Sequence, residues 1–267
     1  GKITFMARKR FSRTPRVTFH GAAGEVTGSM HRLDVFGKSL LLDCGFVQGN
    51  RAESYRRNST FPFRAKDIDA VVLSHAHIDH CGNLPNLLKQ GFNGPIYCTP
   101  ATRALTAVML GDAAKIQFED CQYLNKHREP GEPALEPLYG EGGVYKTLLR
   151  LKAVPYGETV EIVPGVRLSF HDAGHLLGSA MPLLEMDGLR LLFTGDRGRP
   201  GIPILRPPAP LPLAEYVLCE STYGGRTHPP VDETAEQLGA IVRRVVARGG
   251  KLIVPAFSVG RTQTVLY

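Results

Sequence analysis

The sequence predicts an α/β protein in which two β-layers are flanked by helices. Short apolar runs recur along the chain with stretches of helical spacing between them. The run at residues 70–74 is apolar almost throughout, which is typical of a strand buried on both faces. Hydrophobic residues make up 43% of the 267 residues and charged residues 21%, enough for one sizeable core in a soluble protein.

In the first half of the chain, strand-like apolar pieces alternate with helical spacing. We expect strands at 16–20, 31–36, 39–43, 70–74 and 95–99, and helices at 82–90 and 101–126. Prolines and glycines then crowd residues 130–143 and predict a loop there.

The second half returns to strands and adds a stiff connection. Strands are expected at 166–170, 181–186, 189–194, 215–219 and 251–254. Residues 200–212 are too rich in proline for the interior of either element. A helix is expected at 232–248, and another begins near Gly260 and stops at Tyr267 without a cap or breaker, so we expect a piece of a longer protein.

Several classes of protein are disfavoured by simple counts. No apolar run approaches the roughly 18 to 20 residues of a membrane-spanning helix, and the N-terminus lacks the apolar region of a secretory signal. The five cysteines form no CxxC pair and their number is odd, which disfavours a disulfide framework. We therefore expect a cytoplasmic protein with no membrane partner.

The net charge of +7 is concentrated at the N-terminus. Six cations precede the first acid, Glu25, and the rest of the chain is nearly neutral. These cations are Lys2, Arg8, Lys9, Arg10, Arg13 and Arg16. We treat residues 1–15 as a basic arm, which either contacts nucleic acid or is a solvated tail; the sequence leaves both interpretations open.

The strongest chemical signal is the segment HAHIDH at residues 75–80, directly after a predicted strand. In extended backbone, His75 and His77 point to the same side and form a natural pair of ligands for one metal ion. If the chain then turns, Asp79 and His80 can face a second ion. Imidazole and carboxylate together favour zinc, with manganese or iron as weaker options.

Three further polar residues follow predicted strands. His175 comes after the strand at 166–170, and Asp196 follows the apolar run that ends at Thr194. A carboxylate at a strand end can bridge two metal ions. Asp43 ends another strand, where it can orient a ligand histidine without contacting the metal.

Together these residues resemble a known family. Asp43, the HAHIDH segment, His175 and Asp196 match, in order and spacing, the first four motifs of the metallo-β-lactamase superfamily. Four other segments resemble its β-CASP branch, which consists of nucleic-acid-processing nucleases. They are HGAAGEVTGS at 20–29, AGHLLGSA at 173–180, CESTYG at 219–224 and PAFSVGRTQ at 255–263.

The resemblance implies an αββα sandwich with a dinuclear metal site at one edge, followed by the beginning of a β-CASP α/β domain. The expected boundaries are 16–221 for the metallo-β-lactamase domain and 222–267 for the truncated start of the β-CASP domain. By the same resemblance, one zinc is held by His75, His77 and His175, the other by Asp79 and His80, and Asp196 bridges them.

The resemblance also assigns a catalytic acid. Glu220 matches an acid that pairs, in the family, with a histidine farther along the chain. That histidine and one ligand of the second zinc lie beyond Tyr267, so we expect a complete first zinc site and an incomplete second one.

The function expected is that of a zinc-dependent ribonuclease, in which a hydroxide activated by two metal ions hydrolyses phosphodiester bonds. Asp79 and Glu220 are the expected catalytic residues. Tyr223, Ser258 and Arg261 are candidates for contacts with single-stranded RNA.

Other functions stay open. A DNA nuclease of the same branch would share the motifs, and a catalytically incomplete RNA-binding fragment would share the fold. The Glu-Ser-Thr-Tyr segment at 220–223 argues against a hydrolase of small thioesters or lactams. A homodimer and Mn²⁺ in place of zinc are further options.

Overall fold

The structure is a computed structural model that describes residues 14–227 and 231–267, without the side chains of residues 231–233. All but the last two residues of the predicted basic arm lie outside the described residues. The five cysteines are all free. No helix in the described ranges is long and apolar enough to cross a membrane.

Two β-sheets pack face to face. The first has six strands in the order β1-β2-β3-β4-β5-β6 and the second has five in the order β11-β10-β9-β8-β7. The strands of the first sheet are β1 (Arg16–Gly21), β2 (Met30–Val35), β3 (Lys38–Leu42), β4 (Ala70–Val72), β5 (Ile96–Cys98) and β6 (Leu151–Ala153). Those of the second are β7 (Thr159–Val163), β8 (Val166–Asp172), β9 (Ala180–Met186), β10 (Leu189–Phe193) and β11 (Tyr216–Leu218).

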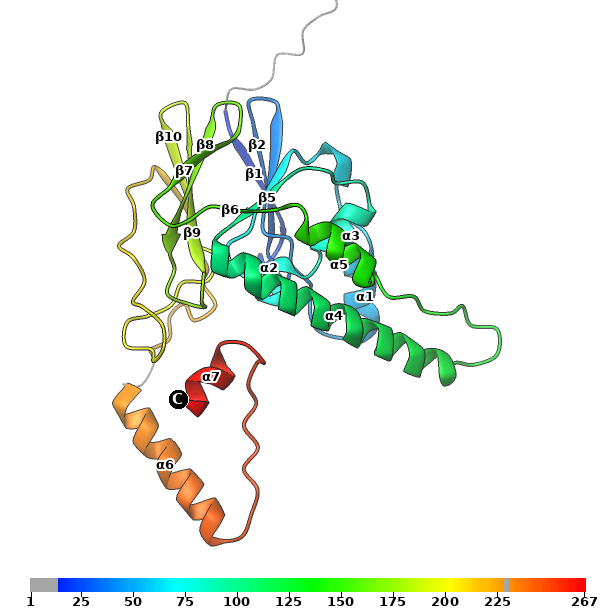
Figure 1. Cartoon of the computed structure of the whole chain (residues 1–267), viewed down its shortest axis with the longest axis vertical. Helices are drawn as coiled ribbons and strands as arrows, with labels where there is room; N and C mark the ends of the chain where they lie inside the picture. The colour runs from blue at the N-terminus through cyan, green and yellow to red at the C-terminus, as the bar shows by residue number, and fades with distance from the viewer. Residues whose placement is uncertain (1–13, 228–230) are drawn as a thin grey trace, which may run out of the picture.

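The first sheet is mixed. Its strands β1, β2 and β3 pair antiparallel, whereas β3 to β6 pair in parallel. Parallel pairing requires crossover connections, which here contain the helices that cover the outer face of this sheet (Figure 1). These helices are α1 (Arg51–Ser59), the 3₁₀ turn η1 (Ala65–Asp67), α2 (Ile78–Cys81), α3 (Leu84–Lys89), α4 (Pro100–Lys126) and α5 (Glu141–Leu148).

Apolar side chains of both sheets form the core between them. Leu40 of β3, Phe170 of β8 and Leu184 of β9 are each fully buried in one cluster. A second cluster lies between the first sheet and its helices and contains Leu41, Leu87 and many other apolar residues. Because neighbouring side chains of β3 enter different clusters, this strand is buried on both faces.

The outer face of the second sheet is covered by a segment without regular structure. Met181 and Leu192 pack there against Ala209 and Ala214, at and just beyond the end of the proline-rich connection predicted at 200–212. In the described part of the chain, this segment takes the position that a second helical layer would occupy.

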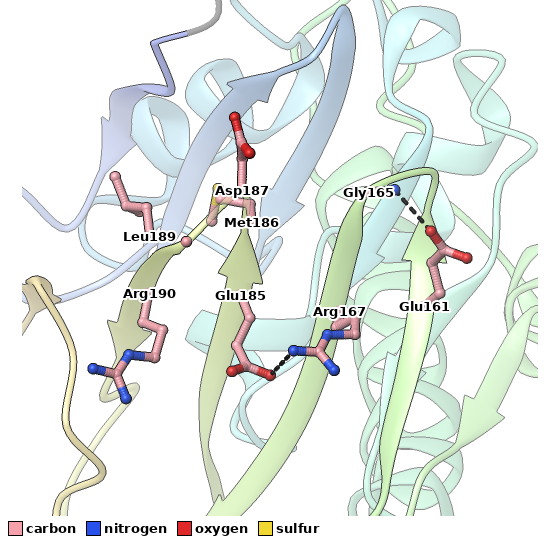
Figure 2. A pocket seen from close by; sticks show the side chains of 9 residues that line it. Glu161, Gly165, Arg167, Glu185, Met186, Asp187, Leu189 and Arg190 are labelled. Carbon is pink, nitrogen blue, oxygen red and sulfur yellow. Dashed lines mark hydrogen bonds and ion pairs between the residues drawn. The ribbon is translucent and has the colours of Figure 1, made fainter.

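Farther along the same sheet, the surface is polar. A pocket of about 550 Å³ opens beside the β7–β8 and β9–β10 turns (Figure 2). Arg167 and Glu185 form an ion pair of 3.2 Å across it, and Glu161 accepts a hydrogen bond from the Gly165 backbone N–H. Arg190, the other cation that lines the pocket, pairs with Glu215 outside the lining.

The chain beyond β11 forms helices α6 (Val231–Ala247) and α7 (Arg261–Leu266), and α7 returns toward the sandwich near α2 (Figure 1). The strand predicted at 251–254 is absent from the structure. Ile253 is 89% exposed and no strand pairs with it among the described residues. An extended backbone without a partner strand forms no ladder.

A second correction concerns the predicted loop at 130–143, whose end is helical. Helix α5 begins at Glu141, with Gly140 at its N-cap. A Cβ on Gly143 would lie 3.3 Å from Tyr139 Cβ, a tight contact with the segment before the helix, and at an ordinary distance of 3.7 Å from Pro85 Cβ in α3. Gly142 and Gly143 therefore lie in a helix and do not mark a turn.

Candidate metal centre

The predicted ligands gather at one edge of the sandwich because they follow strands that end there. Asp43 and His75 follow the neighbouring parallel strands β3 and β4, and His175 and Asp196 follow β8 and β10 of the other sheet. Residues 75–80 continue from β4 into the short helix α2, which turns Asp79 and His80 back toward the same edge. Both sheets therefore contribute to one site.

Four residues form a group that can hold one metal ion. One atom each of His75, His77, His175 and Asp196 lies within 4.8 Å of the others. His77 Nδ1 is 3.0 Å from His75 Nε2 and 3.1 Å from His175 Nε2. Asp196 Oδ2 lies 3.8 Å from His75 Nε2 and 3.4 Å from His175 Nε2.

Asp79 and His80 lie beside this group, outside it. His80 Nε2 is 3.4 Å from Asp196 Oδ1 and 3.9 Å from Asp79 Oδ2. The two oxygens of Asp196 thus face different sets of nitrogens. This is the arrangement expected of a carboxylate between two cations.

Asp43 lies outside the four-residue group and supports the site through hydrogen bonds. It is fully buried and adopts a left-handed backbone with φ of 59°. Its carboxylate accepts hydrogen bonds from Ser29 Oγ at 3.0 Å and from the Ser74 backbone N–H and Oγ at 2.8 and 2.9 Å. Its Oδ2 lies 2.7 Å from His80 Nδ1, which directs His80 Nε2 into the site.

Burial sets the charge of the histidines in the four-residue group. Burial is the main cause that lowers the pKa of His75 well below its ordinary value and that of His77 to about 4. It also lowers the pKa of His175. All three rings are therefore neutral near pH 7 and present lone pairs, which is the form that binds metals.

The carboxylates and His80 behave differently. Burial opposes the charge on Asp196, yet the hydrogen bond from His80 and the nearby histidines hold its pKa at about 2. Burial also opposes the charge on His80, but Asp43 and Asp196 raise its pKa well above the ordinary value. Burial raises the pKa of Asp79.

These observations fit a metal ion. His75, His77 and His175 each turn one ring nitrogen toward the same point, and these nitrogens are 3.0 and 3.1 Å apart in two contacts. Because the rings are neutral, lone pairs on these nitrogens repel one another. A hydrogen bond can relieve only part of this repulsion, because each neutral ring has one N–H. A metal cation among the three nitrogens would accept all three lone pairs at once, and the ionised Asp196 would balance its charge.

Glu220 and the three RNA-contact candidates lie around this centre. Glu220 follows β11 and accepts backbone N–H bonds from Arg197 and Thr222 at 3.2 and 3.3 Å. Its charge raises the pKa of His175, against the larger effect of burial. The structure therefore fixes Glu220 near the site without placing it in the metal group.

The candidates Ser258 and Arg261 are exposed, and the segment that contains them borders the site, since Phe257 lies 6.3 Å from His77 between ring centroids. Tyr223 is 52% exposed in the turn after β11. These positions are open to solvent, as a contact with RNA requires.

Sequence reasoning missed the residues that support the ligands. Ser29 and Ser74 bond to Asp43, and a Cβ on Gly45 would lie only 1.6 Å from the Asp79 carbonyl oxygen. Ser74 stands immediately before the HAHIDH segment, which is a usable signal. Nothing local in the sequence marks Ser29 as a neighbour of Asp43, or Gly45 as a neighbour of Asp79.

Comparison with known proteins identifies the family. The family model of the metallo-beta-lactamase superfamily matches residues 36–256, which include Asp43 and all six predicted metal ligands. The chain belongs to this superfamily. The two-sheet architecture agrees with the predicted fold class.

Several individual proteins of this superfamily are similar to the chain over most of its length. Ribonuclease TTHA0252 of Thermus thermophilus is 39% identical over 252 residues, which are 94% of this chain and 54% of that protein. Transcription termination factor FttA of Methanosarcina mazei is 35% identical over 259 residues, covering 94% and 38%. Cleavage and polyadenylation specificity factor 73 of Drosophila melanogaster is 31% identical over 252 residues, covering 92% and 34%.

These relatives are β-CASP proteins, which confirms the resemblance seen in the motifs. This superfamily member spans about half the length of the first relative and less of the others. The match to the family model extends to residue 256 and so includes part of residues 222–267, which the predicted boundaries assign to a second domain.

Proposed function

We propose that this chain carries the catalytic metal centre of a zinc-dependent ribonuclease of the β-CASP type. The observation that carries the proposal is the convergence of His75, His77, His175 and Asp196 on one point, with Asp79 and His80 beside them. The name of the ribonuclease from Thermus thermophilus supports RNA as the substrate.

The geometry supports the following assignment of metal ligands. His75, His77 and His175 would hold one zinc ion, Asp79 and His80 would contribute to a second, and Asp196 would face both. Two such ions activate water and stabilise charge on the attacking and leaving oxygens of a phosphodiester. Zinc is preferred over Mn²⁺ because the first group is rich in imidazole.

The remaining roles belong to protein side chains. Asp79, with its raised pKa, orients the attacking water and accepts its proton. Asp43, which lies 2.7 Å from His80 Nδ1, keeps Nε2 of that ring turned toward the site, where it would hold the second ion. Glu220, held by backbone N–H groups, is the proposed partner of a proton donor that lies outside this chain.

The rest of the proposal concerns organisation and substrate. Residues 16–221 form the metallo-β-lactamase domain and 222–267 the start of the β-CASP domain. Single-stranded RNA passes the edge of the site, where Tyr223, Ser258 and Arg261 are accessible. A soluble enzyme that processes RNA in the cytoplasm fits these features.

The first test is metal content. Elemental analysis of protein purified without chelator should find about one tightly held zinc per chain. Asp196→Asn should lose most of this zinc, because the neutral amide no longer balances the ion. Asp187→Asn is the matched control, since Asp187 lies at the β9–β10 turn, in a backbone with φ of 48° that Asn also tolerates. Wild-type protein that takes up no zinc would contradict the proposal.

The second test is cleavage, measured in the full-length natural protein. Asp79→Asn should lower kcat on a single-stranded RNA oligonucleotide by roughly 10²- to 10⁴-fold, the range for a lost proton acceptor. RNA affinity should fall far less than kcat, because most of the attraction for the strand comes from cationic side chains that contact phosphates away from Asp79. Equal or faster cleavage of the matching DNA would favour the DNA nuclease, and unchanged RNA cleavage in the variant would exclude the role of Asp79.

A further inference from the structure

The ligand histidines have a second ring nitrogen that needs a partner. His75 Nδ1 lies 3.0 Å from Ser74 Oγ, and His80 Nδ1 lies 2.7 Å from Asp43 Oδ2. His77 is turned the other way round and presents Nδ1 to the centre. Its Nε2 is buried and has no hydrogen-bond partner in the described structure.

The segment 257–260 covers this nitrogen. The Phe257 ring lies 6.3 Å from the His77 ring between centroids, and a Cβ on Gly260 would lie 3.9 Å from His77 Nε2 and 3.4 Å from Leu176 Cδ1. Val259 lies between Phe257 and Gly260.

Side chains of α7 fix the conformation of this segment. Thr262 Oγ1 donates to the Phe257 carbonyl at 2.6 Å, and Gln263 Nε2 donates to the Ser258 carbonyl at 3.0 Å. Thr264 Oγ1 donates to the Gly260 carbonyl at 3.1 Å. The carbonyls on both sides of Val259 are thereby engaged, which leaves the Val259 carbonyl as the acceptor of this segment that is available to His77.

We propose that the backbone carbonyl of Val259 accepts the Nε2–H of His77 and so holds the ring with Nδ1 directed at the metal. The proposal rests on the metal centre proposed above. A metal ion draws electron density from the ring and makes the opposite N–H a stronger donor, so the contact tightens when the ion is present.

This contact makes the segment before α7 a positioning element for the first metal site. The other supports of the site, Ser74 and Asp43, belong to the sandwich itself. Only the support of His77 comes from the chain beyond residue 221, within the described residues. A displacement of that part of the chain would therefore weaken metal binding without any change in a ligand.

The test combines three variants with zinc affinity. Gly260→Ala should displace the segment, because a φ of 93° disfavours any side chain and the new Cβ would contact Leu176 and approach His77. Gly249→Ala imposes the same kind of strain at a φ of 63°, with nothing within 4 Å of its Cβ. Val259→Ala changes the side chain and keeps the carbonyl.

Zinc affinity should be measured by competition with a chromogenic chelator at pH 7. We expect Gly260→Ala to bind zinc roughly 10- to 100-fold more weakly, the range for a lost partner of a ligand histidine. Gly249→Ala and Val259→Ala should stay within about 2-fold of wild type. Wild-type affinity in Gly260→Ala, or an equal loss in Val259→Ala, would overturn the proposal.

A spectroscopic measurement reports the hydrogen bond directly. Long-range ¹H–¹⁵N correlation should show His77 protonated at Nε2, with slow exchange of that proton, in wild-type protein both with and without zinc. Gly260→Ala should exchange this proton faster. Protonation at Nδ1 in the zinc-free wild type would refute the contact. A protein that shows the contact and binds zinc but cleaves no RNA would refute the ribonuclease function alone.

Discussion

His31 is a titratable residue placed in the core. It is 7% exposed on β2, and its ring packs edge-on against Phe19 and Phe193, with centroids 5.2 and 5.6 Å away. Its Nδ1 is buried with no hydrogen-bond partner in the described structure. Burial lowers the pKa of His31, so the folded protein keeps it neutral at a pH where the unfolded chain begins to protonate it.

Replacement of this histidine should therefore stabilise the protein most in mild acid. Below an ordinary pKa of 6.5 the unfolded state binds more protons at His31 than the folded state, so stability falls as the pH falls. His31→Phe removes this dependence, which is worth at most about 1.4 kcal/mol per pH unit. The gain in unfolding midpoint of zinc-free protein should be larger at pH 5.5 than at pH 8. An equal gain at both values would show that His31 does not titrate on unfolding.

Among single residues, the sequence predicted which side chains come together at the metal centre. It did not predict the hydrogen bonds that hold these side chains in place. His75, His77, His175 and Asp196 follow strands, and strand ends at one edge of a sandwich converge. The support of Asp43 by Ser29 depends on a contact across 14 positions that no local pattern records. The ligand roles themselves remain predictions.

Helix α4 contains a glycine that has no evident structural role. Gly111 lies in the middle of this 27-residue helix, and a Cβ there would meet nothing within 4 Å. Glycine in a helix interior costs roughly 0.5 to 1 kcal/mol relative to alanine because it loses more backbone entropy on folding.

We expect Gly111→Ala to stabilise the protein by roughly 0.5 to 1 kcal/mol, or about 2 °C in the unfolding midpoint. Gly143→Ala in α5 is the control, because its Cβ would crowd Tyr139 at 3.3 Å and gain nothing. Calorimetry on both variants checks the difference. Equal effects would mean that helix propensity is not what separates the two sites.

Elements were predictable where periodicity was strong. Helix α4 and strands β8 to β10 were expected within one or two residues of their observed bounds. Helix α1 has a polar sequence that shows no apolar face, and its N-terminal end is set by Asn50, whose side chain caps two backbone N–H groups. Strands β6 and β7 were missed because short edge strands carry little periodic signal.

Buried apolar side chains are distributed unequally along the chain. The three buried clusters and the residues packed against them lie between Val17 and Leu218. Beyond them, large apolar side chains are exposed, including Ile253 at 89% and Leu266 at 81%. The sandwich thus contains the apolar burial that stabilises the described fold.

We therefore expect residues 14–221 to fold alone. In the presence of a chelator, this shortened chain should unfold cooperatively, with a midpoint within a few degrees of the whole chain. The chelator matters, because bound zinc would stabilise the two forms to different extents. A shortened chain that fails to unfold cooperatively would show that residues beyond 221 contribute to the core.

The left-handed backbone of Asp43 restricts how this position can mutate. Aspartate, asparagine and glycine are the residues that adopt a φ near 59° most readily. In the genetic code, both asparagine and glycine are one base change away from aspartate. Neither preserves a carboxylate that accepts from Ser29 and Ser74 and faces His80. The changes that mutation supplies most easily here keep an unstrained backbone. Such variants are therefore expected to lose the support of His80 while the local backbone conformation is kept.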